Sequence, residues 1–230
     1  MRIFVAPLAA GGLTVTGDEH HYLARVRRAR VGDAVELVDG EGRRAAAVIT
    51  AITDASTVLR VDAPEAIPPA LPRVRVLLPL IKGDRMDTCL EKLVEVGVDE
   101  IVVWPAARSV VKLDPDRRDA RLAKYQAALV AAARQCGRAQ VPTVTWADSL
   151  TTAVAALPAG GRYVLDPTSD APLAPAGDDV TFVSGPEGGL APTERDALVS
   201  FTSLGLGPRV LRAETAPVVA VALLRALTRS

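Results

Sequence analysis

The sequence is poor in the residues that form metal clusters and disulfide frameworks. Its 230 residues include two cysteines and two histidines, and the histidines are the adjacent pair His20 and His21. Two cysteines without several further histidines do not make a metal cluster, so no metal is expected. Cys89 and Cys136 lie 47 residues apart in segments that we predict as helices. This arrangement is typical of buried thiols in a reduced, cytoplasmic protein.

Long apolar runs are also absent. The longest uncharged apolar stretch near the C-terminus, Ala216–Leu224, is too short to span a bilayer. The first ten residues resemble a signal peptide only faintly, because Pro7 interrupts the apolar run and the polar residues 18–21 soon follow. We therefore predict a β-strand at the N-terminus and expect a cytoplasmic protein without membrane contacts.

Lysine is scarce, and neither sign of charge is in excess. The chain has 27 Lys and Arg, of which only four are lysines, against 27 Asp and Glu. Residues 1–70 carry eight arginines and nine acidic residues. Bulk charge therefore cannot hold nucleic acid, which leaves local basic patches for that task. Hydrophobic residues make up 49% of the chain, which is enough for a packed core and argues against extensive disorder.

A proline-rich segment divides the chain near residue 70. Residues 63–72 contain four prolines, which remove backbone donors and disfavour helix in the residues before them. Short β-branched strands separated by turn signals precede this linker and suggest a small barrel. The expected strands are Ile3–Ala6, Leu13–Val15, Ala34–Val38, Ala45–Ile52 and Thr57–Val61. One helix, from about Asp18 to Arg27, interrupts them, and Asp18 is its expected N-cap.

After the linker, strands and helices alternate, which predicts an α/β domain with a parallel sheet. The run Val74–Ile81 is apolar throughout, as in a strand buried on both faces, and Gly97 is expected to end the following helix. We expect helices at Asp84–Val96, Asp116–Cys136, Asp148–Ala156 (capped by Asp148), Pro192–Phe201 and Glu214–Thr228. The further expected strands are Glu100–Val103, Thr143–Trp146, Gly161–Asp166, Val180–Gly185 and Thr202–Leu206.

Three segments, 166–168, 184–190 and 204–212, follow strands at the edge where open α/β sheets bind ligands. Neither a dinucleotide-binding glycine motif after the first strand nor a phosphate loop with its lysine occurs. The segments instead offer backbone amides and carbonyls beside leucines, which suits a flat purine ligand without phosphates. A plain turn is the alternative for such glycine-rich sequence.

Two C-terminal motifs carry a family resemblance. Residues 185–189 (GPEGG), followed by 206–216 (LGPRVLRAETA), resemble the signature of the small-subunit rRNA uridine-N3 methyltransferase (RsmE) family. Residues 82–98 and 135–142 are similar to further motifs of that family, and residues 2–4 and 21–28 match its N-terminal domain more loosely. The likeness covers nearly the whole chain. Arg134 departs from it, because an acidic residue is expected at that place.

The resemblance implies a fold and a reaction that the residue pattern alone does not. Residues 1–70 would form a PUA-like RNA-binding barrel, and residues 71–230 a SPOUT methyltransferase domain with a C-terminal trefoil knot. S-adenosylmethionine would bind in the knot of a homodimer, and one uridine of 16S rRNA in the small ribosomal subunit would be methylated at N3. The candidate cofactor-binding residues are Leu165, Ser184, Gly185, Pro186, Glu187, Gly188, Gly189, Leu204, Leu206, Gly207, Pro208, Leu211, Thr215 and Ala216.

The methyl donor, S-adenosylmethionine, is a sulfonium and is already activated. The barrier to the reaction therefore lies in making N3 of the uracil nucleophilic as its imide proton leaves. A guanidinium at O2 and O4 would stabilise the developing charge, and Arg212 and Arg209 are the candidates. A structural ion pair is the alternative for Arg209. Glu214 could act as general base, cap the last helix with Thr215, or position the ligand. Capping or positioning is favoured, because a carboxylate of ordinary pKa is a poor match for an imide.

Local cation density predicts RNA contacts, with a solvated helix face as the alternative. The candidates are Arg25, Arg27, Arg28, Arg30, Lys82, Arg85 and Arg138. We expect weak affinity for naked RNA and dependence on a folded ribosomal particle.

Two other classes of function stay open. A ribosome assembly factor that binds RNA without catalysis would not bind S-adenosylmethionine, and an α/β enzyme for small nucleotide-like substrates would be indifferent to RNA.

Overall fold

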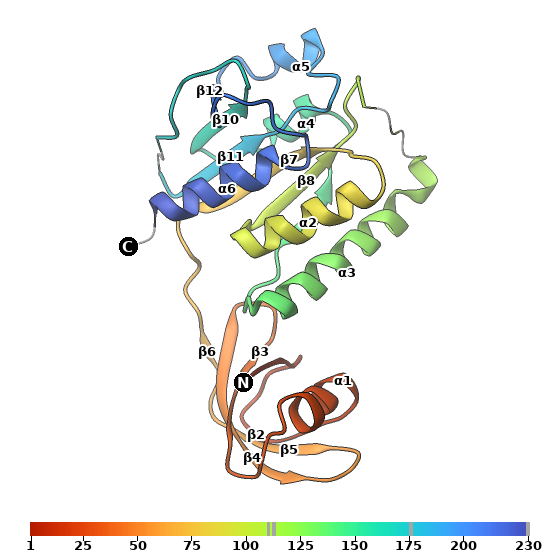
Figure 1. Ribbon diagram of the computed structural model, residues 1–230, viewed down its shortest axis with the longest axis vertical. Coiled ribbons are helices and arrows are strands. Elements are labelled where there is room, and N and C mark those ends of the chain that lie inside the picture. Colours follow the sequence, from red (N-terminus) through yellow and green to blue (C-terminus); the bar gives the residue numbers. More distant parts are fainter. Residues whose placement is uncertain (110, 112–113, 175–176, 229–230) are drawn as a thin grey trace. The chain divides into compact units, whose positions relative to one another are not determined.

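The computed structural model describes residues 1–109, 111, 114–174 and 177–228, and the chain divides into two compact units (Figure 1). The first unit comprises Met1–Pro69 together with Ala133–Val141, and the second comprises Ala70–Ala132 and Pro142–Ser230. Each unit has its own six-stranded sheet in the described residues. The chain is thus of the α/β class that its sequence predicts.

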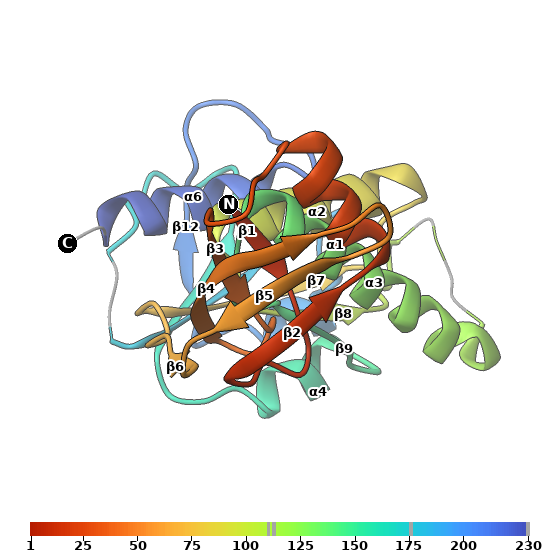
Figure 2. The ribbon, with the colours of Figure 1, turned by 90° about the horizontal axis from the view of Figure 1, so that it is seen from below.

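The first unit is built on a mixed sheet with the strand order β1-β3-β4-β5-β2 (Figure 2). β1 runs parallel to β3, the other neighbours are antiparallel, and the short β6 pairs with β4. Leu23, Leu37, Ile49 and Leu59 are buried in the core of this unit. The five predicted strands are confirmed, and β6 lies within the proline-rich segment. The strands are β1 Arg2–Phe4, β2 Gly11–Val15, β3 Ala34–Val38, β4 Arg43–Ile52, β5 Thr57–Val61 and β6 Glu65–Ala66.

The predicted helix of this unit has two parts, α1 (Gly17–His21) and a π-helical turn at Tyr22–Val26. The prediction that Asp18 is the N-cap is wrong. Thr16 is the N-cap, and Asp18 is the second residue of the helix. There the carboxylate is near the positive end of the helix dipole, which is favourable without a capping hydrogen bond.

The segment Ala133–Val141 belongs to the first unit, and its contacts explain the unusual Arg134. The guanidinium of Arg134 lies 5.5 Å from the centre of the Phe4 ring, and its Nη1 is 3.6 Å from Oε1 of Glu19. The backbone N–H of Val141 also donates to the carbonyl of Gly40 at 2.8 Å. Arg134 therefore packs within this unit, where an acidic residue would face Glu19 with like charge.

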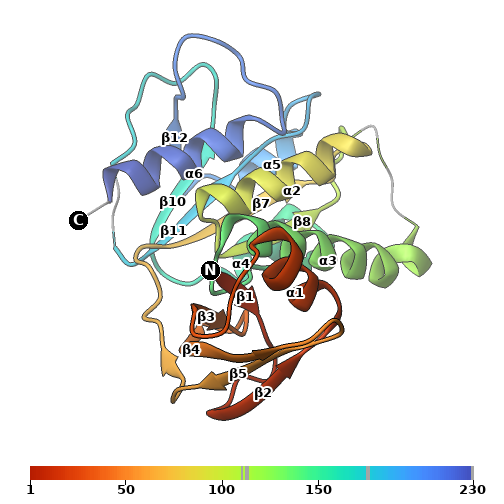
Figure 3. The same cartoon turned by 60° about the horizontal axis from the view of Figure 1, so that its bottom comes forward.

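The second unit has a fully parallel sheet with the order β12-β10-β11-β7-β8-β9. Helices α2 and α6 lie side by side on one face, and α4 packs against β8 on the other (Figures 1 and 3). The strands are β7 Arg73–Pro79, β8 Glu100–Trp104, β9 Thr143–Trp146, β10 Gly161–Leu165, β11 Asp179–Val183 and β12 Thr202–Leu204. The helices are α2 Asp84–Val96, α3 Arg118–Cys136, α4 Leu150–Ala155, α5 Pro192–Asp196 and α6 Ala216–Leu227, and a 3-10 turn at Pro115–Arg117 precedes α3.

Several predicted helix boundaries in this unit are wrong. The starts predicted at Asp116 and Glu214 lie two residues before the observed starts of α3 and α6. Asp148 does not cap α4, because Ser149 is the N-cap and its Oγ accepts the N–H of Thr152 at 3.0 Å. The Asp148 carboxylate is instead 3.0 Å from the guanidinium of Arg118. The helix expected to reach Phe201 ends at Asp196, and a turn follows it. The helix α2 and its end at Gly97, which has a φ of 101°, are as predicted.

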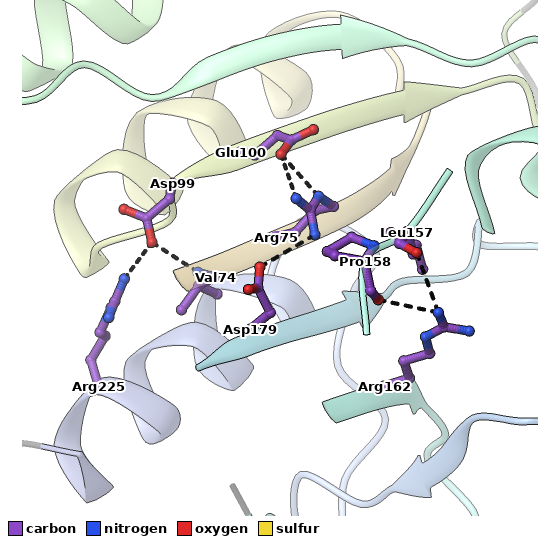
Figure 4. A network of polar contacts seen from close by, with 9 residues as sticks. All are labelled: Val74, Arg75, Asp99, Glu100, Leu157, Pro158, Arg162, Asp179 and Arg225. Carbon is purple, nitrogen blue, oxygen red and sulfur yellow. Dashed lines mark hydrogen bonds and ion pairs between the residues drawn. The ribbon is translucent and has the colours of Figure 1, made fainter. Parts of the chain in front are cut away.

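A polar network lies at the amino ends of the parallel strands, opposite the edge where a ligand is expected (Figure 4). Arg75, at the start of β7, bonds Glu100 of β8 at 2.7 Å and lies 4.0 Å from Asp179 of β11. Arg225 of α6 donates to the carbonyls of Pro72 and Gly97 and to Asp99. The network therefore ties the last helix to the base of the sheet.

Replacing Arg225 with alanine is expected to lower the free energy of unfolding by about 3 kcal/mol, because it removes the ion pair with the largely buried Asp99 and the bonds to two carbonyls. The Arg225 side chain is only 16% exposed, so water cannot replace these bonds fully. Urea unfolding followed by circular dichroism measures the change. A loss below about 1 kcal/mol would show that the network contributes little.

Candidate active site

Three loops at the carboxyl edge of the second sheet enclose a cavity of about 390 Å³. They follow β10, β11 and β12, whose carboxyl ends meet because these strands are parallel neighbours. The volume is in the range of roughly 300–1,000 Å³ that is typical of small-molecule sites. The lining residues are Leu165, Asp166, Pro167, Ser184, Gly185, Pro186, Glu187, Gly189, Leu204, Leu206, Gly207, Arg209, Val210, Leu211, Arg212, Ala213 and Ala216.

Most of the predicted cofactor and catalytic residues line this cavity. The predicted residues that lie outside the lining are Gly188, Pro208, Thr215 and Glu214. The residues that line it without having been singled out are Asp166, Pro167, Val210 and Ala213. All four belong to, or directly adjoin, the three predicted segments. The three segments therefore located the cavity correctly. Which side chains in them face the cavity depends on the loop conformation, which local sequence does not determine.

The last loop is in close contact with both of the others. A Cβ at Gly205 would lie 1.8 Å from the carbonyl oxygen of Ser169, so only glycine fits there. On the other side, the buried Oγ of Ser184 donates to the carbonyl of Ala213 at 3.3 Å. Residues 205–213 are thus held between the loops that follow β10 and β11.

The glycine loop after β11 is a compact turn. The N–H of Gly189 donates to the carbonyl of Pro186 at 2.9 Å, and Gly189 has a φ of 71°. Glu187, within this turn, bonds Arg85 of α2 at 3.1 Å. The glycine loop is thereby joined to the first turn of α2.

Asp166 supplies an ionised group to the cavity wall. The hydroxyl and the backbone N–H of Thr168 donate to its Oδ1 at 2.7 and 2.9 Å. These two hydrogen bonds hold the pKa of Asp166 below its ordinary value of 3.8, and the bond from the Thr168 hydroxyl has the larger effect. At neutral pH the carboxylate is therefore an acceptor for hydroxyl or amino groups of a ligand.

Arg212 and Glu214 form a pair at the end of the last loop. Nη1 of Arg212 is 3.9 Å from Oε1 of Glu214. The Arg212 side chain is 74% exposed, whereas that of Glu214 is 15% exposed. Oε2 of Glu214 is buried, with no hydrogen-bond partner among the described residues. Glu214 thus reaches the interior, and Arg212 lies at the cavity rim.

The expectation that Glu214 and Thr215 cap the last helix by their side chains is wrong. The helix α6 begins at Ala216, and its N-cap residue Thr215 makes no side-chain hydrogen bond. Glu214 precedes the N-cap, too early in the chain to accept from the first turn, and the next helical residue is Pro217, which has no N–H to donate. Of the three roles considered for Glu214, positioning and proton transfer remain.

The two thiols have different environments, although both were expected to be buried. Cys136, the last residue of α3, is exposed, whereas Cys89 of α2 is buried. Burial, helped by the negative charge of Glu214, raises the pKa of the Cys89 thiol to about 12.

Native protein at pH 8 is therefore expected to react with iodoacetamide at Cys136 at least ~100-fold faster than at Cys89, because the thiolate is the reactive species. Mass spectrometry of the alkylated peptides against time measures both rates. Fast alkylation of Cys89 without unfolding would contradict the burial described. Protein unfolded in urea is the control, in which both cysteines react.

The predicted RNA-binding residues fall into three places. Arg25, Arg27, Arg28 and Arg30 are exposed on the first unit, and Arg25 lies 3.8 Å from Asp54. Lys82 and Arg85 are exposed beyond the carboxyl end of β7, near the glycine loop. Arg138 is half-buried in the segment that follows α3.

Comparisons with known proteins identify the family of this chain. Residues 69–225 match an RNA methyltransferase domain family, and residues 15–61 match an RNA methyltransferase PUA domain. The ribosomal RNA small subunit methyltransferase E of Mycobacterium tuberculosis is 37% identical over 93% of this chain and 86% of its own length. The chain belongs to the small subunit rRNA methyltransferase E family. The resemblance drawn from the two C-terminal motifs is thereby confirmed.

Other members of this family support the same assignment. The Bacillus subtilis enzyme of the same name is 27% identical over 90% of this chain and 87% of its own length. The structure of the Neisseria gonorrhoeae enzyme, bound to S-adenosyl methionine, superposes with a TM-score of 0.79. It is 29% identical and covers 99% of this chain and 97% of its own. The fold of this family member is therefore that of solved relatives.

The cavity suits S-adenosylmethionine. Leu165, Leu206 and Leu211 give it apolar walls for a flat base, and the backbone of the glycine loop lines the same space.

Among the described residues, no group of three or more His, Cys, Asp and Glu side chains is close enough to hold a metal ion. In the described part of the chain, none of the helices combines the length and apolar character that crossing a membrane requires.

Proposed function

We propose that this protein transfers a methyl group from S-adenosylmethionine to N3 of one uridine in 16S rRNA of the small ribosomal subunit. The observation that carries the proposal is the cavity of about 390 Å³, walled by the three loops whose sequence also marks the family. When bound there, S-adenosylmethionine supplies a methyl group on a positively charged sulfur. The protein must then hold the uracil and stabilise its conjugate base.

Arg212 and Arg209 line the cavity, and we propose that they stabilise the conjugate base of the uracil. As the N3 proton leaves to solvent water, negative charge spreads over O2 and O4 of the uracil ring. Guanidinium groups at those oxygens lower the energy of that anion. Glu214, 3.9 Å from Arg212, is proposed to orient it from the protein interior rather than to remove the proton itself.

We further propose that the domains divide at residue 70. Residues 1–70 would form the PUA-like RNA-binding barrel with the arginines at 25, 27, 28 and 30, and residues 71–230 the SPOUT methyltransferase domain. The passage of residues 205–213 between two other loops, with Gly205 against Ser169 and Ala213 bonded to Ser184, supports a trefoil knot there. Such threading is rare among protein folds.

A homodimer is proposed as the working state of this cytoplasmic enzyme. Leu223 and Leu227 of α6 are 43% and 60% exposed, and large apolar side chains on one helix suit a protein interface. Sedimentation equilibrium tests it, with an expected mass of twice 24.1 kDa. A single species of 24.1 kDa at micromolar concentration would contradict the dimer.

The substrate proposal is tested with radiolabelled S-adenosylmethionine and small subunits from a strain that lacks this gene. We expect label in small subunits at least ~10-fold faster than in naked 16S hairpins, because residues 1–70 carry no net positive charge to hold free RNA. Large subunits are the matched control. Cofactor binding without transfer to small subunits would move the substrate to another RNA, whereas neither transfer nor cofactor binding would favour the assembly-factor alternative.

A further inference from the structure

Residues 105–109, the loop that follows β8, have no part in the mechanism above but contact the glycine loop. Ser109 Oγ donates to the carbonyl of Leu80 at 2.7 Å, and the N–H of Ala107 donates to Oε1 of Glu194 at 2.8 Å. The loop is therefore fixed at two points on either side of Arg108. A fixed loop beside a ligand cavity is a means of holding one side chain at a defined place.

Glu194 makes one of these attachments from a buried position. Glu194 is only 8% exposed. Its second carboxylate oxygen, Oε2, accepts a hydrogen bond from the N–H of Ala191 at 2.7 Å. A buried carboxylate is costly unless hydrogen bonds satisfy both oxygens, and here two backbone donors do so. Glu194 thereby joins the loop 105–109 to the chain just after the glycine loop.

Arg108 itself lies directly against the glycine loop. Its Nη1 donates to the carbonyl of Gly188 at 3.3 Å. A Cβ at Gly188 would be 3.0 Å from Cβ of Arg108 and 3.1 Å from its carbonyl oxygen, so glycine permits this close approach. Arg85 meanwhile bonds the neighbouring Glu187. Two arginines, one in the first turn of α2 and one in the loop after β8, thus hold consecutive residues of the glycine loop.

The two arginines differ in charge balance. Arg85 is paired with the carboxylate of Glu187, whereas Arg108 donates to a neutral carbonyl. The carbonyl occupies one of five guanidinium donors and leaves the positive charge of the exposed Arg108 uncompensated by this contact. A guanidinium of this kind matches a phosphate, which it can bind through two parallel hydrogen bonds.

We infer that Arg108 binds a backbone phosphate of the RNA next to the target uridine, and that Glu194 positions it. The inference rests on the proposed function, because the anion it assigns is that of the substrate RNA. It adds a residue of the loop after β8 to the RNA-binding surface predicted at Lys82 and Arg85. Arg108 contributes to holding the RNA, and the chemical step is left to Arg212.

The test compares Arg108→Met with the matched control Arg195→Met. Arg195 is also exposed, and its Nε donates to one backbone carbonyl near the same loop, that of Leu190, at 3.2 Å. The Kd for small subunits is measured between 50 and 200 mM KCl, together with the Kd for S-adenosylmethionine and kcat. Arg108→Met is expected to raise the subunit Kd about 5- to 10-fold. It is also expected to lower the salt slope by roughly 0.7–0.9, the value for one lost phosphate contact.

The other readouts separate RNA binding from a structural role. We expect the cofactor Kd and kcat of Arg108→Met to stay within about two-fold of wild type, and Arg108→Lys to recover the salt slope. Arg195→Met should keep the wild-type slope, and Glu194→Gln should weaken subunit binding without a change in kcat. An unchanged slope in Arg108→Met, an equal change in Arg195→Met, or a 10-fold loss of cofactor affinity would overturn the inference. Wild-type protein that neither labels nor binds small subunits would overturn the proposed function, and this assignment with it.

Discussion

Replacing Arg212 with alanine is expected to lower kcat for methyl transfer by about 10- to 100-fold while leaving the Kd for S-adenosylmethionine within about two-fold of wild type. The guanidinium is proposed to stabilise charge that develops on uracil O2 and O4 only as the N3 proton leaves. Removing it should therefore affect the transition state more than the bound cofactor. The side chain is 74% exposed, so solvent screens part of its charge and the loss should fall below that of a fully buried group.

Single-turnover rates and calorimetric cofactor binding measure the two quantities separately. Lys124→Ala is the control, because Lys124 is an exposed cation with an acidic partner, Asp87, 3.1 Å away on the same unit. It should leave both quantities unchanged. If Arg212→Ala lost cofactor affinity and rate to the same extent, Arg212 would belong to cofactor binding or folding instead.

Gly205→Ala is expected to be the most disruptive change at the site. The added methyl would lie 1.8 Å from the carbonyl oxygen and 2.8 Å from the carbonyl carbon of Ser169, both backbone atoms that cannot rotate away. The last loop must then shift away from the loop after β10, which opens the cavity wall. We expect a loss of about 3 kcal/mol or more in the free energy of unfolding and at least ~10-fold weaker cofactor binding.

Thermal unfolding with and without S-adenosylmethionine measures both effects. Gly12→Ala is the matched control, because a Cβ there meets nothing within 4 Å. It should be neutral or slightly stabilising. A Gly205→Ala protein with wild-type stability and cofactor affinity would show that residues 205–213 do not have to pass so closely between the other loops.

The parts of the fold that local sequence encodes were predictable. The helix Asp84–Val96 has apolar residues at helical spacing and Gly97 at its end, and both boundaries agree with the structure. The strand Ala34–Val38 agrees as well, between its turn signals. The three segments that line the cavity could be located because they follow apolar strands of a predicted parallel sheet.

Contacts between distant segments were not predictable in this way. Arg134 is 115 positions from Glu19 in the sequence, and Ala107 is 87 positions from Glu194, so no local pattern joins them. The strand predicted to reach Leu206 stops at Leu204, because Gly205 turns against Ser169. The Glu214 cap failed for a related reason, since the start of α6 depends on how residues 205–213 pass between two loops.

The measurement that tests the central claim most directly is the position of the methyl group. Small subunits from a strain lacking this gene are incubated with the protein and radiolabelled S-adenosylmethionine, and the modified nucleotide is mapped by mass spectrometry. We expect one methyl group per 16S rRNA, on N3 of a single uridine, and at least ~10-fold slower labelling with Arg212→Ala. A methyl group on ribose, on another base, or only on an RNA outside the small subunit would contradict it.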